Sequence, residues 1–306
     1  MLVDNGKEDF SQNDIHVFKR EVISSTHINF LFGAGVNGTA LPQLKDFIKT
    51  KEIIEELGGD ISDGLEAGID SIEEDYDRAK IKQLFIEEFN KFHEKAISVE
   101  NTNSALENLE LLLKKIYLIV QKSENRNPSM KQVNIYTLNY DDLVERKLMK
   151  LGYLYNSISA SNANTKAALM NVIGLDYVTR KYIPSFMISK LHGNIQKPII
   201  PGKAKYRDML NEDYFEIAFN MKEKLCRNNS ILIVIGYSGK DEHINRILQE
   251  CLNAGLTIYW FKYSESDFIP FCPSSQIVVR GQEDYSKKND STKNCFDDLE
   301  FIWIEQ

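Results

Sequence analysis

The sequence predicts an α/β fold, with a Rossmann-like parallel sheet, helices on both faces and a helical insertion. Short apolar segments recur along the chain, helix-like patterns separate them, and several of the segments run directly into glycine or polar residues. Such alternation favours a parallel sheet, whose ligands bind beyond the carboxyl ends of the strands. With 306 residues, of which 42% are hydrophobic, the chain can bury a substantial core in one large domain or two smaller ones.

Five segments have the length and the content of Ile, Val, Phe and Tyr that are typical of strands. They are Ile28–Phe32, Val133–Leu138, Phe186–Leu191, Ile231–Ile235 and Leu256–Phe261. In addition, Phe301–Ile304 resembles a buried closing strand. We expect the chemistry of the protein at the carboxyl ends of the strands.

The intervals between these segments predict the domain organisation. Residues 1–24 form an N-terminal extension, and residues 25–306 form one nucleotide-binding domain. Apolar residues at helical spacing between about 47 and 125 predict a helical insertion, whose charged residues form its solvated face. A second, smaller insertion is expected at about 152–182, where Ser157–Asn164 is small and polar.

The overall charge excludes some classes of partner. A net charge of -8 and a pI near 5.3 give no general attraction for nucleic acid or for an anionic membrane. We find no secretory signal and no apolar run long enough to span a membrane, so we expect a soluble cytoplasmic protein. The four cysteines form no C-x-x-C pair, so we expect free buried thiols and no metal.

The end of the first expected strand carries the pattern Gly33-x-Gly35-x-x-Gly38. A glycine loop exposes backbone N–H groups beside a helix N-terminus, which suits a diphosphate. A turn with a purely structural role is the alternative, since one such match is a weak signal. Pro42 suits the first position of the following helix, so the loop is longer than that of a hydride-transfer dehydrogenase.

Three more strand ends carry polar residues. Asn139 and Asp141 follow the second strand, and we expect the next residue, Asp142, to cap a helix. His192 lies beside a glycine that leaves its ring accessible, although a structural role is the alternative. After the fourth strand, glycines permit close backbone approach and Ser238 offers a hydroxyl to a phosphate or ribose.

Together, these motifs resemble the sirtuin family over roughly residues 25–262. The motifs in question are Gly33-Ala34-Gly35 with Ala40-Leu41-Pro42, Thr137-Leu138-Asn139-Tyr140-Asp141, Leu191-His192-Gly193 and Gly236-Tyr237-Ser238. The chain departs from sirtuin deacylases because Lys197–Lys203 stands where they carry a four-cysteine zinc ribbon. Asn37 also stands near a family serine, and Gln43 and Leu44 occupy the stretch where the family has an arginine. The Asn-Tyr-Asp form of the second motif resembles bacterial sirtuin-like proteins that degrade NAD in defence against phage.

The resemblance implies a sirtuin-like NAD-binding domain in which NAD is the substrate. It implies that Asn139 positions the ribose and the attacking water, and that His192 is the base. Asp141 would bind the carboxamide of nicotinamide. The residues that the resemblance assigns to binding NAD are Gly33, Ala34, Gly35, Val36, Asn37, Asp141, Gly236, Tyr237 and Ser238.

The favoured interpretation is an NAD glycohydrolase of a bacterial defence system. The alternatives are an NAD-dependent protein deacylase or ADP-ribosyltransferase, and a non-catalytic module that senses a nucleotide. Asn139 and His192 argue against the module, because binding a diphosphate alone does not require both. An NADase that is always active would harm its host, so we expect a homo-oligomer, a regulatory partner protein of the same system, or both. No membrane or nucleic-acid partner is indicated.

Overall fold

The computed structural model describes residues 12–42, 46–62, 65–100, 102–121, 126, 130–160, 184–199, 214–265, 267–272, 274–281 and 290–300. Its centre is a seven-stranded sheet in which all pairs of neighbouring strands are parallel, with the order β3-β4-β2-β1-β5-β6-β7. The strands are β1 His27–Phe32, β2 Val133–Thr137, β3 Tyr155–Ser159, β4 Phe186–Lys190, β5 Ser230–Ile235, β6 Thr257–Phe261 and β7 Ile277–Arg280. The predicted Rossmann-like α/β fold is confirmed.

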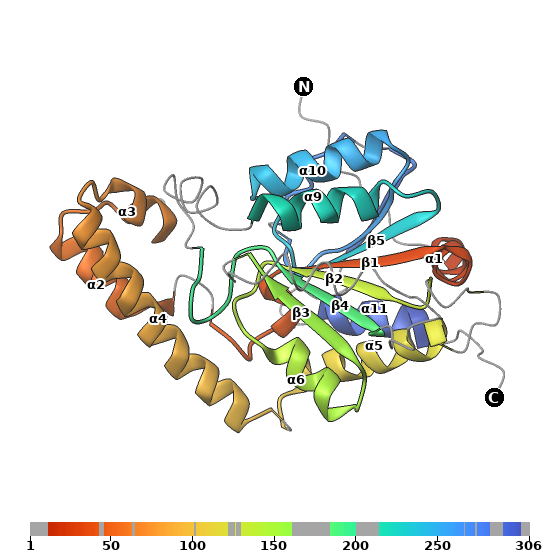
Figure 1. Cartoon of the computed structure of the whole chain (residues 1–306), viewed down its shortest axis with the longest axis horizontal. Coiled ribbons are helices and arrows are strands. Elements are labelled where there is room, and N and C mark those ends of the chain that lie inside the picture. Colours follow the sequence, from red (N-terminus) through yellow and green to blue (C-terminus); the bar gives the residue numbers. More distant parts are fainter. Residues whose placement is uncertain are drawn as a thin grey trace, which may run out of the picture.

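Helices cover both faces of this sheet (Figure 1). Helices α9 and α10 lie on one face, and α5, α6 and α11 lie on the other. The α-helices are α1 Gln12–Ser24, α2 Ile48–Glu56, α3 Leu65–Ser71, α4 Asp75–Ser98, α5 Ser104–Gln121, α6 Leu143–Lys150, α9 Tyr214–Leu225, α10 Glu242–Asn253 and α11 Asp290–Glu300. A 3-10 helix, η1 Ala34–Asn37, follows β1.

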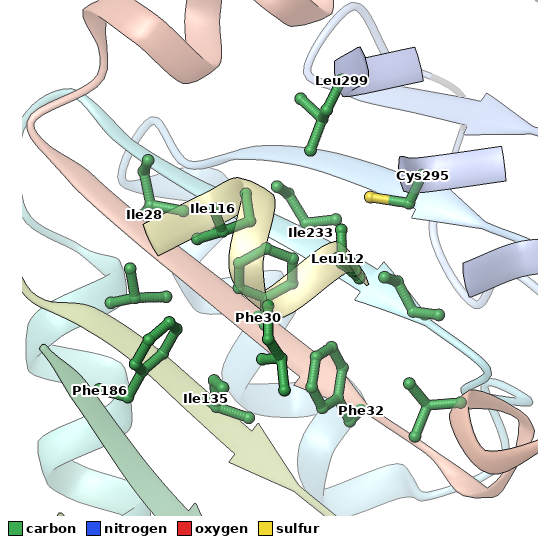
Figure 2. Packing of buried hydrophobic residues seen from close by; sticks show 14 of the residues in the cluster. Ile28, Phe30, Phe32, Leu112, Ile116, Ile135, Phe186, Ile233, Cys295 and Leu299 are labelled. Carbon is green, nitrogen blue, oxygen red and sulfur yellow. The ribbon is translucent and has the colours of Figure 1, made fainter. Parts of the chain in front are cut away.

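Alternate residues of the central strands build the core on each face. Phe30 and Phe32 of β1 join Ile135 and Ile233 of the neighbouring strands against α5 and α11, as Figure 2 shows. Leu31 points to the opposite core, with α9 and α10. Because both faces are covered, β1, β2, β4 and β5 are buried along almost their whole length and read as apolar runs.

Helices α2, α3 and α4 extend away from the sheet (Figure 1) and have an apolar cluster of their own. Phe47 lies between α4 residues Phe85 and Phe89, with ring centroids 4.7 and 6.2 Å away. Tyr140, which follows β2, meets both α4 rings edge-on with centroids 5.9 Å apart. Tyr140 therefore joins this cluster to the carboxyl end of the sheet. Helix α5, although inside the interval of the predicted insertion, packs on the sheet itself.

Several smaller predictions differ from the structure. β3 and β7 were not predicted because they are short, partly exposed edge strands; β3 lies inside the second predicted insertion and reads Tyr-Asn-Ser-Ile-Ser. Pro42 is not the first residue of α2, contrary to the prediction, because α2 begins at Ile48 with Phe47 as its N-cap residue; residues 43–45 lie outside the described residues. The predicted strand at Phe301–Ile304 lies outside the described residues. The four thiols are free as expected, but only Cys251 and Cys295 are buried, whereas Cys226 is half-buried and Cys272 is exposed.

One hydrogen-bonded chain of polar side chains joins β5, β1, β2 and α9. The Asn29 amide of β1 donates to Ser230 Oγ of β5 at 2.8 Å, and Asn29 Oδ1 accepts from the Asn134 amide of β2 at 2.9 Å. Lys224 Nζ of α9 donates to Asn134 Oδ1 at 2.9 Å. Burial, followed by the nearby Arg227 charge, lowers the pKa of Lys224 to about 8. These buried amides are therefore satisfied by neighbouring elements.

None of the helices in the described part of the chain has the length and apolar content required to cross a bilayer.

Candidate active site

The loops after β1 and β5 touch each other through glycine. Gly33 N–H donates to Ile235 O and Gly35 N–H donates to Gly236 O, both at 3.0 Å. A Cβ on Gly33 would lie 2.3 Å from Gly236 O, and a Cβ on Gly236 would lie 2.3 Å from Val36 N. Gly236 also has a φ of +68°, which side chains rarely adopt. The glycines therefore allow two backbones to meet where the strand order reverses, which is where α/β sheets bind ligands.

The same contacts occupy part of the predicted phosphate loop. Gly33 and Gly35 use their N–H groups in the bonds to the β5 side, and Val36 N–H donates to Gly33 O at 3.1 Å. Ala34 is the exposed residue of this loop. A diphosphate at this loop would have to approach from the side of Ala34.

Asn37 and Asp141 form a buried pair at the centre of this region. The Asn37 amide donates to Asp141 Oδ2 at 2.9 Å, and both residues are almost fully buried. Burial raises the pKa of Asp141, against the opposing effect of Lys190, which donates to the Asp141 carbonyl. Asn37 Oδ1 is buried and has no hydrogen-bond partner among the described residues. Such an orphaned acceptor is costly unless a ligand or water satisfies it.

The turn after β2 contradicts the predicted role of Asp142. Asp142 occupies the N-cap position of α6, but its side chain makes no cap hydrogen bond. Instead Asp141 Oδ1 accepts the Leu143 N–H at 3.0 Å, and Asp142 Oδ1 lies 2.8 Å from His93 Nε2 of α4. The capping prediction is wrong because the Asp142 carboxylate contacts His93, which is far away in the sequence, instead of the first N–H groups of α6.

Asn139 lies between the β2 turn and the glycine loop. Its amide donates to Gly33 O at 3.1 Å, and its N–H donates to Thr137 Oγ1 at 3.1 Å. Thr137 pairs with Lys190 of β4, and Leu191 N–H donates to Thr137 O. Asn139 and His192 each lie two residues beyond this last pair. The two predicted catalytic residues therefore stand at the ends of adjacent strands.

His192 is buried, so the expectation of an accessible ring is wrong, and the ring faces a second histidine instead of solvent. Its Nε2 lies 3.2 Å from Nε2 of His243 and 3.8 Å from Asp241 Oδ1. Asp241 is the N-cap residue of α10, and His243 lies in the first turn of that helix. Neither was predicted, because the sequence does not show that a residue of the β5–α10 turn reaches the end of β4. Their position just after a strand end was the available signal.

Tyr237 and Ser238 complete the predicted set. The Tyr237 ring is buried against Trp260, with centroids 5.5 Å apart, and its hydroxyl lies 2.8 Å from Asn245 Oδ1. The side chain of Tyr237 is thus part of the core, and only its backbone remains for a ligand. Ser238 is partly exposed, and its carbonyl accepts the Phe268 N–H at 3.1 Å.

A cavity of about 400 Å³ lies beside this region. It shares the β2 and β4 turns with the site but none of the predicted site residues line it. The described residues that line it are Asn90, His93, Glu94, Tyr140, Asp142, Glu145, Ser157, Ile158, Ser159, Lys190, Asn194, Ile195 and Gln196. In the wall of the cavity, Lys190 Nζ lies 3.1 Å from Glu145 Oε1, and His93 Nε2 lies 2.8 Å from Asp142 Oδ1. Most of the ionisable side chains that line the cavity are therefore paired with one another.

Residues 133–277 match the family model described as the SIR2-like domain. The match runs from β2 to the start of β7 and includes Asn139, Asp141, His192 and the Gly236–Ser238 loop. No curated protein matches the chain. Over these residues the chain is similar to a SIR2-like domain, and this match confirms the predicted resemblance to a sirtuin-like family. Such domains bind NAD, so NAD-related chemistry at the carboxyl edge of the sheet agrees with the match.

Proposed function

We propose that this chain hydrolyses the bond between nicotinamide and ribose in NAD and thereby depletes NAD in a bacterial defence against phage. The observation that carries the hydrolysis is the register between β2 and β4, whose last pair is Thr137 and Lys190, so that Asn139 and His192 each follow two residues after paired strand ends. Asp141, two residues after Asn139 in the chain, forms the buried pair with Asn37. NAD is the substrate, and nicotinamide and ADP-ribose are the products.

The reaction requires a leaving group, a stabilised cation and a nucleophile. Departure of neutral nicotinamide leaves positive charge on the ribose, and water then attacks the anomeric carbon. Asn139, held by its bond to Gly33 O, orients the ribose and the water. His192 takes a proton from a ribose hydroxyl or from the water, a role that suits imidazole because its ordinary pKa is near neutrality.

The nicotinamide carboxamide fits the pair of Asn37 and Asp141. A carboxamide has two N–H donors and one acceptor. The buried Asn37 Oδ1, which lacks a partner among the described residues, supplies an acceptor for one donor. Asp141 supplies a second acceptor, or a donor when it is protonated, and burial raises its pKa in that direction. This match supports nicotinamide as the group that leaves.

The test measures NAD loss with purified full-length variants. We expect Asn139→Ala and His192→Ala to lower turnover about 10²- to 10⁴-fold, as general acid–base groups typically contribute. Asn253→Ala, at the far end of α10, and His16→Ala on α1 are matched controls that we expect to retain turnover. Chromatography should show nicotinamide and ADP-ribose in equal amounts. Wild-type turnover in both site variants would refute the assignment.

Product analysis also decides between the two enzymatic proposals. A deacylase would release O-acyl-ADP-ribose from an acylated peptide, and an ADP-ribosyltransferase would leave a modified protein. Hydrolysis requires only NAD and water. Either of the first two products, without free ADP-ribose, would favour the alternative.

The defence role includes control of the activity by assembly or by a partner protein. Phe215 and Phe219, one turn apart on α9, expose 58% and 68% of their surface, which supports a contact surface on that helix. We expect cellular NAD to fall after phage infection in bacteria that carry the wild-type chain and its partner, but not with His192→Ala. Unchanged NAD in both strains, alongside an active purified enzyme, would contradict the defence role.

A further inference from the structure

Three metal-ligating side chains meet across the carboxyl edge of the sheet. His192 follows β4, whereas Asp241 and His243 lie at the start of α10, after β5. β2 and β1 separate these two strands in the sheet. The candidate ligand atoms of the three residues nevertheless lie within 4.8 Å of one another. Two distant segments thus bring two imidazoles and a carboxylate to one point.

We propose that His192, Asp241 and His243 form a binding site for a divalent transition-metal ion. Zinc binds imidazole nitrogen at about 2.0–2.1 Å, so two histidines at a tetrahedral angle have their nitrogens about 3.3 Å apart. The observed Nε2–Nε2 distance is 3.2 Å. Asp241 Oδ1 lies 3.8 Å from His192 Nε2 and is the third candidate donor.

The donor types narrow the class of metal. Two imidazoles and one carboxylate suit Zn²⁺, Fe²⁺ or Co²⁺, whereas Mg²⁺ and Ca²⁺ favour oxygen ligands. Three protein ligands leave at least one position for water, as in catalytic rather than structural zinc sites. A hydrogen bond between the rings would have the same 3.2 Å length, and the Asp241 carboxylate, within 4.8 Å of both nitrogens, adds the third donor. The expectation of no metal rests on the cysteines, which do not contribute here.

The proposal has a consequence for activity that rests on the proposed function. A bound metal uses the lone pair on His192 Nε2, which the base needs to accept a proton. It also places positive charge beside a ribose that becomes positive as nicotinamide leaves. Metal in this site therefore inhibits NAD hydrolysis.

Cobalt binding tests the site without any NAD. The full chain is treated with a chelator, dialysed and titrated with Co²⁺, whose visible absorption reports nitrogen and oxygen ligation, and Zn²⁺ is then added to displace it. We expect one ion per chain, and more than about 100-fold weaker binding in His243→Ala, beyond the 10- to 100-fold effect typical of outer-shell partners. Asp241→Asn, whose side chain is partly exposed, guards against misfolding of the first variant.

His16→Ala, on α1, is the control for non-specific histidine binding and should retain wild-type affinity. No uptake by the wild type, or equal uptake by wild type, His243→Ala and Asp241→Asn, overturns the site.

Activity tests the inhibition separately. With NAD as substrate, we expect Zn²⁺ to lower the turnover of the chelator-treated wild type more than tenfold and the chelator to restore it. In His243→Ala, the ratio of turnover without and with zinc should approach one. Stimulation by zinc, or no effect at an occupied site, overturns the inhibition. If the metal-free wild type does not cleave NAD, the proposed function fails, while the cobalt spectrum still decides whether the metal site exists.

Discussion

Gly236→Ala will separate the packing role of the glycine loops from their backbone strain. The new methyl group would lie 2.3 Å from Val36 N and 2.5 Å from Gly35 C, and these backbone atoms cannot rotate away. Gly152 provides a matched control, because its φ of +71° is close to the +68° of Gly236 and no heavy atom lies within 4 Å of its added Cβ. The two substitutions therefore share the strain but differ in the clash.

The expected magnitudes follow from these two terms. A left-handed conformation costs an L-residue about 1–2 kcal/mol, and overpacking adds about 1–3 kcal/mol. The reduced flexibility of the unfolded chain favours alanine by about 0.4–1 kcal/mol at both sites and cancels in the comparison. We therefore expect Gly236→Ala to lower the free energy of unfolding by about 1–3 kcal/mol more than Gly152→Ala.

Urea titrations followed by far-ultraviolet circular dichroism measure this difference. Below the unfolding transition, Gly236→Ala should also weaken NAD turnover, whereas Gly152→Ala, remote from the two loops, should not. Equal losses of stability in the two variants would refute the reasoning, since they would show that the loops separate without cost.

Two further predictions concern buried lysines. Lys147, with 1% of its side chain exposed, lies 3.2 Å from Glu110 and 3.3 Å from Glu100, so Lys147→Ala should cost about 3–5 kcal/mol in urea titrations. Lys150, 48% exposed and 2.8 Å from the same Glu110 carboxylate, is the control and should cost no more than about 1 kcal/mol; similar losses would contradict the role of burial. For Lys224, burial lowers the pKa from 10.5 to about 8, so the folded state binds the proton more weakly than the unfolded state. Stability relative to Lys224→Met should rise by at most about 3 kcal/mol as the pH increases from about 8 to 10.5, and a flat difference over this range would contradict the burial of this charge.

The parts of the fold that could be predicted are those that depend on residues close together in the sequence. β1, β2, β4, β5 and β6 are buried on both faces and mostly apolar, so they can be recognised in the sequence. The edge strands β3 and β7 pair with only one other strand and are partly exposed, so their sequences lack a long apolar run. Asn139 and His192 could be selected because parallel strands bring their carboxyl ends to one edge. Long-range partners escaped prediction: Asn37 meets Asp141 104 positions later, and His192 meets His243 51 positions later. Such pairs depend on loop paths that no spacing rule describes.

The amides of Asn29 and Asn134 have a consequence for how the strands find their neighbours. Most of the other side chains of β1 and β2 are apolar. Hydrophobic burial alone would therefore tolerate a strand at the wrong position in the sheet, or one shifted in register along its neighbour. In the native order, Asn29 sits opposite Asn134, and the two amides bond to each other, to Ser230 and to Lys224. A mispaired sheet would bury these groups without partners, at about 1–3 kcal/mol each. The two amides therefore destabilise incorrectly paired sheets more than they stabilise the correct one.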